Sequence, residues 1–282
     1  VLPQKNDQQM NNNKKLVLAY SGGLDTTYCA VYLKEQGYDV HAVTVQTGGF
    51  TATELANIGK RAMALGVASF EIADVTNAYY STCIRHLIYG NVLKNGTYPL
   101  SVSAERMIQA KAVADYARTI GARYIAHGST GAGNDQVRFD MTFRSTIPDA
   151  TIITPIRDMQ LSREEEIAYL RKNGVTMNFE KAAYSINKGL WGTSVGGKET
   201  LTSNTPLPES AWPTPVTETE PRGITLHFNK GELCGLNDRT DMTPIEVITE
   251  LQEMAQPYGI GRDIHVGDTI IGIKGRVGFE AA

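Results

Sequence analysis

Short apolar runs alternate with longer stretches of helical periodicity through the first 175 residues of the chain. A short apolar run between turn residues predicts a buried strand, whereas apolar residues spaced three and four apart predict a helix. Glycine repeatedly follows a helical stretch, where its tolerance of positive φ lets the chain turn back. The predicted strands cover residues 16–20, 40–47, 68–75, 124–126 and 150–155, and the predicted helices cover residues 26–36, 54–65, 104–120 and 162–172.

This order of elements predicts an α/β fold. Apolar strands that alternate with helices form a parallel sheet that is covered on both faces. We therefore predict a Rossmann-like nucleotide-binding domain at residues 14–175. Residues 1–13 are polar, and we expect them to be a disordered or cloning-derived extension.

The pattern changes after about residue 178. Residues 187–221 are rich in Gly, Thr, Ser and Pro, which predicts an irregular segment that is either functional or flexible. Beyond it, alternating residues and turn signals predict two hairpins, and Pro at a first turn predicts a helix. These elements cover residues 223–236, 264–279 and 243–254, so residues 176–282 form a second, α+β domain in this prediction.

Composition and charge exclude some classes of protein. Lys and Arg total 27 and Asp and Glu total 30, so the formal net charge of −3 gives no basic footprint for nucleic acid. Cys29, Cys83 and Cys234 are too far apart for a disulfide framework or a zinc cluster, which favours the cytoplasm. No apolar run approaches the ~20 residues that span a bilayer, and no secretory signal is expected.

The first candidate site is the string SGGLDT at residues 21–26, directly after the first predicted strand. A glycine pair lets the backbone approach an anion, and N–H groups at a helix N-terminus point at that anion. Ser21 and Thr26 add hydroxyl donors, while Asp25 can hold magnesium or orient the loop. The alternative is an ordinary capped turn, but the full string between a strand and a helix favours a phosphate site.

A second polar loop, HGSTGAGNDQVRF at residues 127–139, follows another predicted strand. Thr130, Asn134, Asp135 and Arg138 supply a hydroxyl, an amide, a carboxylate and a guanidinium. Arginine pairs with carboxylates and aspartate with ammonium groups, so this set suits a zwitterionic amino acid. From the residues alone, a capped helix start at the surface remains the alternative.

Together these loops resemble those of the ATP pyrophosphatase superfamily. The string SGGLDT resembles its pyrophosphate loop, and residues 128–139 resemble the signature of the argininosuccinate synthases within it. The string YPLSVS at residues 98–103, leading into Arg106, resembles the citrulline segment of that family. The resemblance covers most of residues 14–279 and is weakest in the Gly- and Pro-rich segment.

The resemblance implies a ligase that forms a C–N bond in arginine biosynthesis. In that family the ureido oxygen of citrulline attacks the α-phosphate of Mg-ATP and pyrophosphate leaves. The aspartate amine then displaces AMP from citrullyl-AMP. The resemblance further implies a cytoplasmic homotetramer with no nucleic-acid or membrane partner, and we expect the family's C-terminal oligomer segment to be missing after Ala282.

Matching positions carry the family's roles onto this chain. Asp25, Asp135 and Arg138 are the candidate catalytic residues, and Asp25 is also the candidate magnesium ligand, although the ion would bind mainly through the ATP phosphates. The candidates for ATP are Ala19, Tyr20, Ser21, Gly22, Gly23, Leu24, Asp25, Thr26, Thr27, Val45 and Gly128; those for citrulline are Tyr98, Ser103, Asn134, Arg138, Ser185 and Ser194; and those for aspartate are Thr130, Asn134 and Asp135.

Two positions depart from the family pattern. Gly267 and Phe279 stand where the family has a glutamate and a tyrosine that contact citrulline. Asp268 or Glu280 is a candidate to replace the carboxylate, whereas Phe279 can pack but cannot donate a hydrogen bond. His127, beside the second loop, either supports that loop or contacts substrate.

Two rival functions stay open. A tRNA-thiolating enzyme on the same nucleotide fold would need reactive cysteines and a basic surface. Cys29 lies one helical turn after the first loop, but it has no partner nearby in sequence. A non-catalytic protein that senses ATP or AMP stays open because of the departures at Gly267 and Phe279, and turnover would exclude it.

Overall fold

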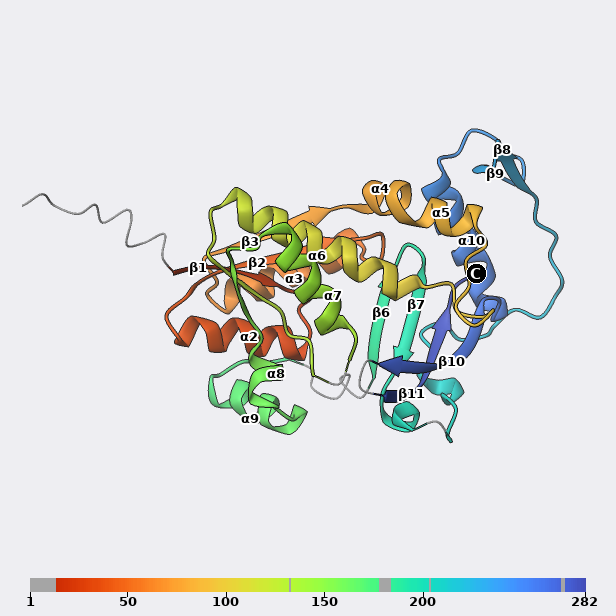
Figure 1. Cartoon of the computed structure of the whole chain (residues 1–282). Coiled ribbons are helices and arrows are strands. Elements are labelled where there is room, and N and C mark those ends of the chain that lie inside the picture. The colour runs from red at the N-terminus through yellow and green to blue at the C-terminus, as the bar shows by residue number, and fades with distance from the viewer. Residues whose placement is uncertain (1–13, 132, 178–183, 203, 270–271) are drawn as a thin grey trace, which may run out of the picture. The chain divides into compact units, whose positions relative to one another are not determined.

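The computed structural model describes residues 14–131, 133–177, 184–202, 204–269 and 272–282 of the chain (Figure 1). Its residues pack into two compact units. Unit 1 takes its described residues from 14–46, 50–75 and 106–182, and unit 2 takes them from 47–49, 76–105 and 183–282. The predicted single boundary near residue 175 assigns residues 47–49 and 76–105 to the first domain, whereas in the structure these residues pack with unit 2. The predicted extension at residues 1–13 lies outside the described residues.

Unit 1 is built on a parallel sheet, with five strands in the described residues in the order β3-β2-β1-β4-β5. The central strand β1 is apolar on both faces, since Leu16, Val17 and Leu18 have no exposed surface. That pattern is typical of a strand inside a covered parallel sheet, so the predicted α/β fold is confirmed. The strands are β1 (Lys15–Ala19), β2 (Asp39–Gln46), β3 (Ser69–Asp74), β4 (Tyr124–Ala126) and β5 (Thr151–Ile153).

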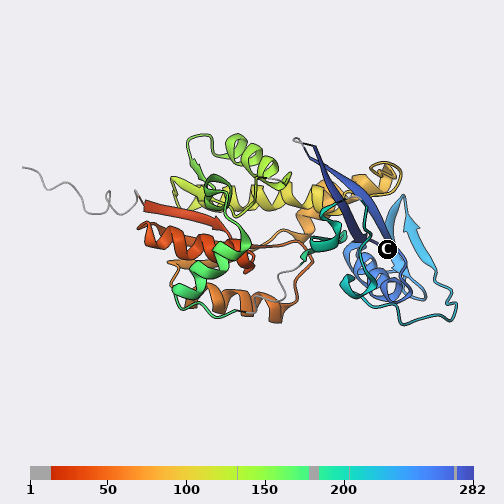
Figure 2. The same ribbon diagram turned by 90° about the horizontal axis from the view of Figure 1, so that it is seen from below.

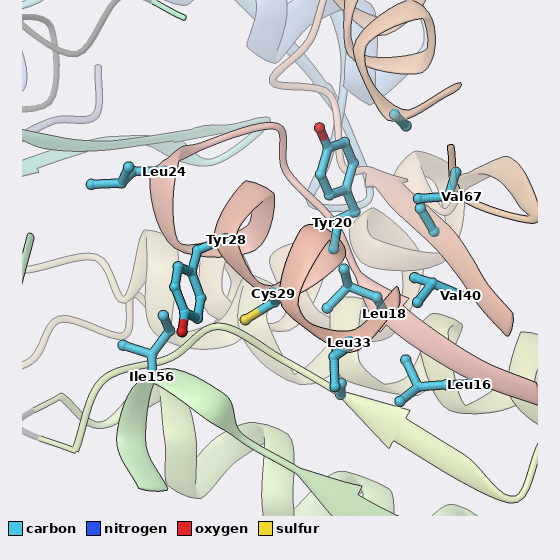
Figure 3. Close-up of a cluster of buried hydrophobic side chains, with 14 of the residues drawn as sticks. Leu16, Leu18, Tyr20, Leu24, Tyr28, Cys29, Leu33, Val40, Val67 and Ile156 are labelled. Atoms are coloured by element: carbon cyan, nitrogen blue, oxygen red, sulfur yellow. The ribbon is translucent and has the colours of Figure 1, made fainter. Parts of the chain in front are cut away.

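Helices cover both faces of this sheet, with α2 and α6 on opposite sides (Figures 1 and 2). On one face, Leu16 and Leu18 belong to a cluster that also takes side chains from α2, α3, α8 and α9. Figure 3 shows Leu33 of α2 near Leu16 and Leu18, and Ile156 of α8 beside Tyr28. On the other face, Val17 packs against α6 and α7. The helices are α2 (Leu24–Glu35), α3 (Ala52–Ala64), α6 (Ser101–Thr119), α7 (Asp135–Thr146), α8 (Pro155–Met159) and α9 (Arg163–Lys172).

Unit 2 contains antiparallel sheets, one in the order β10-β11-β7-β6 and a separate β8–β9 pair among its described residues. Both predicted hairpins are confirmed, and the longer, β10–β11, is the dark blue ribbon in Figure 2. The prediction that residues 187–221 form an irregular segment is wrong for residues 187–196, where β6 and β7 pair. The elements are β6 (Ser185–Gly189), β7 (Gly192–Gly196), β8 (Leu226–Asn229), β9 (Glu232–Leu236), α10 (Pro244–Ala255), β10 (Arg262–Thr269) and β11 (Gly272–Glu280).

A helical segment of unit 2 was not predicted from the sequence. It runs through α4 (Thr76–Tyr79), a π-helical turn (Tyr80–Ile84) and α5 (Arg85–Tyr89). Glu232 on β9 accepts hydrogen bonds from Tyr80 and, at 2.7 Å, from Tyr89. These short helices therefore depend on a partner far along the chain, which local periodicity does not reveal. Among the described residues, no helix combines the length and apolar character needed to cross a membrane.

We expect Phe143→Ala to lower the free energy of unfolding by about 3–5 kcal/mol, because the ring is fully buried and its loss leaves a cavity. The control is Met141→Ala on the same helix, where the side chain is 59% exposed and the loss should stay within about 0.5 kcal/mol. Urea unfolding followed by circular dichroism measures both. Equal losses in the two variants would contradict this packing of α7.

Candidate functional site

The two predicted loops of unit 1 meet at the carboxyl edge of its sheet. They follow β1 and β4, which are neighbours, and the strand order reverses between them. In open α/β sheets, ligands bind at such a switch point. A Cβ added at Gly128 would lie 3.2 Å from both the carbonyl carbon and the Cβ of Asp25, so the second loop touches the start of α2.

The first loop is held by its own hydroxyl groups. The backbone N–H of Ser21 donates to Thr26 Oγ1 at 3.3 Å, and Thr26 Oγ1 donates to the carbonyl of Gly23 at 3.4 Å. Gly22 has a φ of +73°, in the region that favours glycine. Gly23 is the N-cap of α2, and no side-chain hydrogen bond caps that helix. The first N–H groups of α2 are therefore arranged as an anion site requires.

Several predicted ATP-binding side chains belong to the hydrophobic core of unit 1. Tyr20, Leu24 and Thr27 are each at most 5% exposed, and Val45 packs in the cluster on the α6 face. Ala19 is half-buried at the end of β1. Any contact of Tyr20, Leu24 or Thr27 with a nucleotide would therefore come from the backbone, and these assignments stay predictions.

Asp25 points to a buried partner, Glu166 on α9. The Glu166 carboxyl hydrogen-bonds to Asp25, and its Oε2 has no partner among the described residues. Burial, and then the charge of Asp25, raise the pKa of Glu166 to about 8; burial also raises the pKa of Asp25. Two carboxyl groups this close hold one proton between them, so Glu166 donates and Asp25 accepts near neutral pH.

His127 supports the second loop. Its ring is 1% exposed, and Nδ1 accepts the backbone N–H of Ser129 at 3.2 Å. We therefore assign the proton to Nε2, which donates to Asp140 Oδ1 at 3.0 Å. Arg157 Nη1 donates to the other Asp140 oxygen at 2.9 Å. Of the two roles left open for His127, loop support is the one that its contacts favour.

Asp135 joins two arginines at the start of α7. Arg106 Nε donates to Asp135 Oδ2 at 3.1 Å, and Arg138 Nη1 donates to Oδ1 at 2.8 Å. Burial favours a higher pKa for Asp135, but the two guanidinium groups outweigh it and hold the pKa below its ordinary value. Its carboxylate therefore orients both guanidinium groups. Of the other candidates in this loop, Thr130 is exposed and Asn134 is the half-buried N-cap of α7.

The remaining candidates belong to unit 2, where several gather on one face of the antiparallel sheet. The Tyr98 ring stacks on His265 with 4.2 Å between centroids and contacts Phe279 at 5.3 Å. Phe279 pairs with Ser194 across β11 and β7, so their side chains share a face. The backbone N–H of Val102 donates to the Tyr98 hydroxyl at 3.0 Å. Tyr98, Ser194 and Phe279 therefore lie on the same face of the antiparallel sheet of unit 2.

The two other citrulline candidates lie at the ends of elements in unit 2. Ser185 is exposed at the start of β6, on the same face as Asn187, which pairs with Ser194. Ser103 is half-buried in the first turn of α6. The register thus brings Ser185 and Ser194 to one sheet face, and the assignment of these serines to citrulline stays a prediction.

The contacts of Glu280 argue against it as the replacement for the family's carboxylate. Its side chain is 1% exposed and accepts hydrogen bonds from Arg262 Nε at 3.2 Å and Thr214 Oγ1 at 3.0 Å. Successive residues of a strand face opposite sides, so Glu280 points away from the face of Phe279. The side chain of Asp268, the other candidate, lies outside the described residues.

Comparison with known proteins covers both units. The model of the arginosuccinate synthase N-terminal HUP domain matches residues 15–176, and that of the arginosuccinate synthase C-terminal domain matches residues 184–282. The argininosuccinate synthase of Xylella fastidiosa is 39% identical over 96% of this chain and 68% of its own length. That of Methanocaldococcus jannaschii is 37% identical over 94% of this chain and 67% of its own length.

We expect Glu166→Gln to change how stability depends on pH. Because the pKa of Glu166 is raised in the folded protein, its stabilising contribution is complete below the unfolded pKa of about 4.3 and is lost as pH rises towards 8. Glutamine keeps a donor to Asp25 and cannot ionise. Between pH 5.5 and 8.5 the variant should therefore gain about 1–3 kcal/mol relative to the unmodified protein.

Urea unfolding at the two pH values measures this difference. Glu164→Gln is the matched control, since Glu164 is exposed on the same turn of α9 and should leave the pH dependence unchanged. An identical pH dependence for Glu166→Gln and the unmodified protein would show that Glu166 does not hold a proton against Asp25.

Proposed function

Since the chain belongs to the argininosuccinate synthase family, we propose that it is the ligase that joins citrulline to aspartate at the expense of ATP. The observation that carries this proposal is the meeting of two loops at the switch point of the parallel sheet. One loop presents uncapped N–H groups at a helix start, and the other leads into Asp135 and Arg138, with Arg106 of α6 paired to the same Asp135. Such a site can position an anionic nucleotide beside an amino-acid substrate.

In the proposed reaction, residues 21–26 bind the ATP phosphates through backbone N–H groups and the hydroxyls of Ser21 and Thr26. The ureido oxygen of citrulline forms a bond to the α-phosphorus, and pyrophosphate leaves with the electrons of the broken P–O bond. The amine of aspartate then attacks the ureido carbon, loses a proton and releases AMP. No residue needs to act as a covalent nucleophile, so the rate comes from positioning and charge stabilisation.

The amino-acid substrates are assigned to residues of both units. The family resemblance assigns Asn134 and Arg138 of unit 1 to citrulline, and it also assigns Tyr98, Ser103, Ser185 and Ser194 of unit 2 to citrulline. Thr130, Asn134 and Asp135 would contact aspartate, with Asp135 acting mainly through the arginines that it orients. The contacts around Tyr98 and Phe279 support an apolar wall for citrulline in place of the family's tyrosine hydroxyl.

Magnesium enters this proposal as part of the substrate, Mg-ATP. Asp25 was the candidate ligand, but its carboxyl is hydrogen-bonded to Glu166. Within the described ranges, no cluster of three or more His, Cys, Asp or Glu side chains could hold a metal ion. Magnesium is commonly held by substrate phosphates, and that is the arrangement these residues fit.

The contacts of Cys29 argue against a thiolating enzyme. Its side chain is fully buried among Leu18, Tyr28 and Leu33, as Figure 3 shows, and burial raises the pKa of its thiol. A thiol in such surroundings is a poor nucleophile. The three cysteines are all free, which supports the cytoplasm as the site of the reaction, and the family resemblance supports a homotetramer.

The test is pyrophosphate release from Mg-ATP by the full-length protein, with citrulline and aspartate added singly and together. We expect release only when citrulline is present, with AMP and argininosuccinate formed when aspartate is added. ATP binding without release under any combination would contradict the ligase and favour a nucleotide sensor. Release that depends on another acceptor would contradict citrulline as the substrate.

Alkylation separates the proposed ligase from the thiolating rival. We expect iodoacetamide to modify Cys29 at least about tenfold more slowly than the half-buried Cys83 and Cys234 in the native protein, and at a similar rate in urea. Peptide mass spectrometry measures the three sites separately. Rapid modification of native Cys29 with loss of pyrophosphate release would instead point to a reactive cysteine at the site.

A further inference from the structure

Arg61 lies beside the first loop of unit 1. It stands in the last turn of α3, three residues after Ile58, whose side chain is buried in the core. Residues three apart lie on neighbouring parts of a helix surface, so Arg61 stands beside Ile58, and its side chain is exposed. A Cβ built on Gly22 would lie 2.7 Å from Arg61 Nη2 and 3.3 Å from Ile58 Cγ1.

The contact with Gly22 places the positive charge of Arg61 beside the first loop. Gly22 has positive φ, and loops of this kind turn successive N–H groups towards an anion. The guanidinium group fills the space that a side chain at this position would take. The same charge acts on the residue before the loop, because burial raises the pKa of the Tyr20 hydroxyl and Arg61 opposes that rise.

No ion pair joins Arg61 to a carboxylate in the part of the chain that the structure describes. By contrast, Arg106 and Arg138 are both paired with Asp135 at the second loop. A guanidinium group beside an anion-binding loop and without an acidic partner is matched in charge and geometry to phosphate.

We infer that Arg61 binds the β- and γ-phosphates of ATP and stabilises pyrophosphate as it leaves. The inference rests on the proposed function. When the ureido oxygen bonds to the α-phosphorus, the bond between that phosphorus and the bridging oxygen breaks. The electron pair goes to the departing pyrophosphate, and the Arg61 cation beside the loop offsets the negative charge that develops there.

The experiment compares Arg61→Met with Lys60→Met in the full chain. Methionine at 61 keeps an unbranched apolar stem beside Ile58 and removes the charge. Lys60 is exposed on the same helix, about 100° around the axis, so its variant removes an equal charge away from the loop. Arg61→Lys keeps the charge and loses the fork of donors.

The readouts are calorimetric binding of magnesium pyrophosphate and the steady-state constants for ATP and citrulline. We expect Arg61→Met to weaken pyrophosphate binding and lower kcat/KM for ATP by about tenfold to a hundredfold, with KM for citrulline within about twofold. Arg61→Lys should fall between, and Lys60→Met should match the unmodified protein. A purely structural role would change the constants of both substrates together.

Equal pyrophosphate binding by Arg61→Met and Lys60→Met would overturn the inference, even if the unmodified protein makes argininosuccinate. If the unmodified protein binds pyrophosphate but forms no argininosuccinate, the proposed function fails. Selective loss of pyrophosphate binding in Arg61→Met would then still support the phosphate contact. An unmodified protein that binds no pyrophosphate would overturn both.

Discussion

The close approach of the second loop to the start of α2 is the constraint on which the candidate site in unit 1 depends. Neighbouring parallel strands lie about 5 Å apart, so the loops that follow β1 and β4 must share one small space. Gly128 allows this, because any side chain there would press against Asp25. His127 then fixes the second loop through Ser129, and Glu166 fixes the start of α2 through Asp25. Both supporting side chains are buried, so they hold the loops from within the protein.

Features that depend on neighbours in the chain were predictable from the sequence. The strands of unit 1 and its helices α2, α3, α6 and α9 follow from short apolar runs, glycine stops and the capping box between Ser162 and Glu165, which the structure confirms. The helices α7 and α8 were not predicted. The SGGLDT string predicted a loop between strand and helix because glycines and hydroxyls act locally there. The first loop and the second loop were therefore found before any contact between them was known.

Features that depend on distant partners were not predictable. Glu166 is one of three consecutive glutamates at the start of α9, and only the packing of α9 against α2 brings it to Asp25. Arg106 and Asp135 are 29 residues apart on different helices, so no spacing rule joins them. The β6–β7 hairpin has few residues of high strand propensity, but β7 pairs with β11, and this pairing outweighs local preference.

The carboxylates around the two loops are occupied by groups of the protein itself. Asp25 accepts a hydrogen bond from the protonated Glu166, Asp135 accepts from two guanidinium groups, and Asp140 accepts from His127 and an arginine. A charged carboxylate near the phosphates would repel ATP. The arginines beside Asp135 and Asp140 offset that repulsion, and the charge of Arg163 opposes the negative charge that the Asp25–Glu166 pair keeps. At the first loop, the uncapped N–H groups of α2 and the charge of Arg61 then add positive potential. The local electrostatics of unit 1 therefore favour a polyanion before any amino acid arrives.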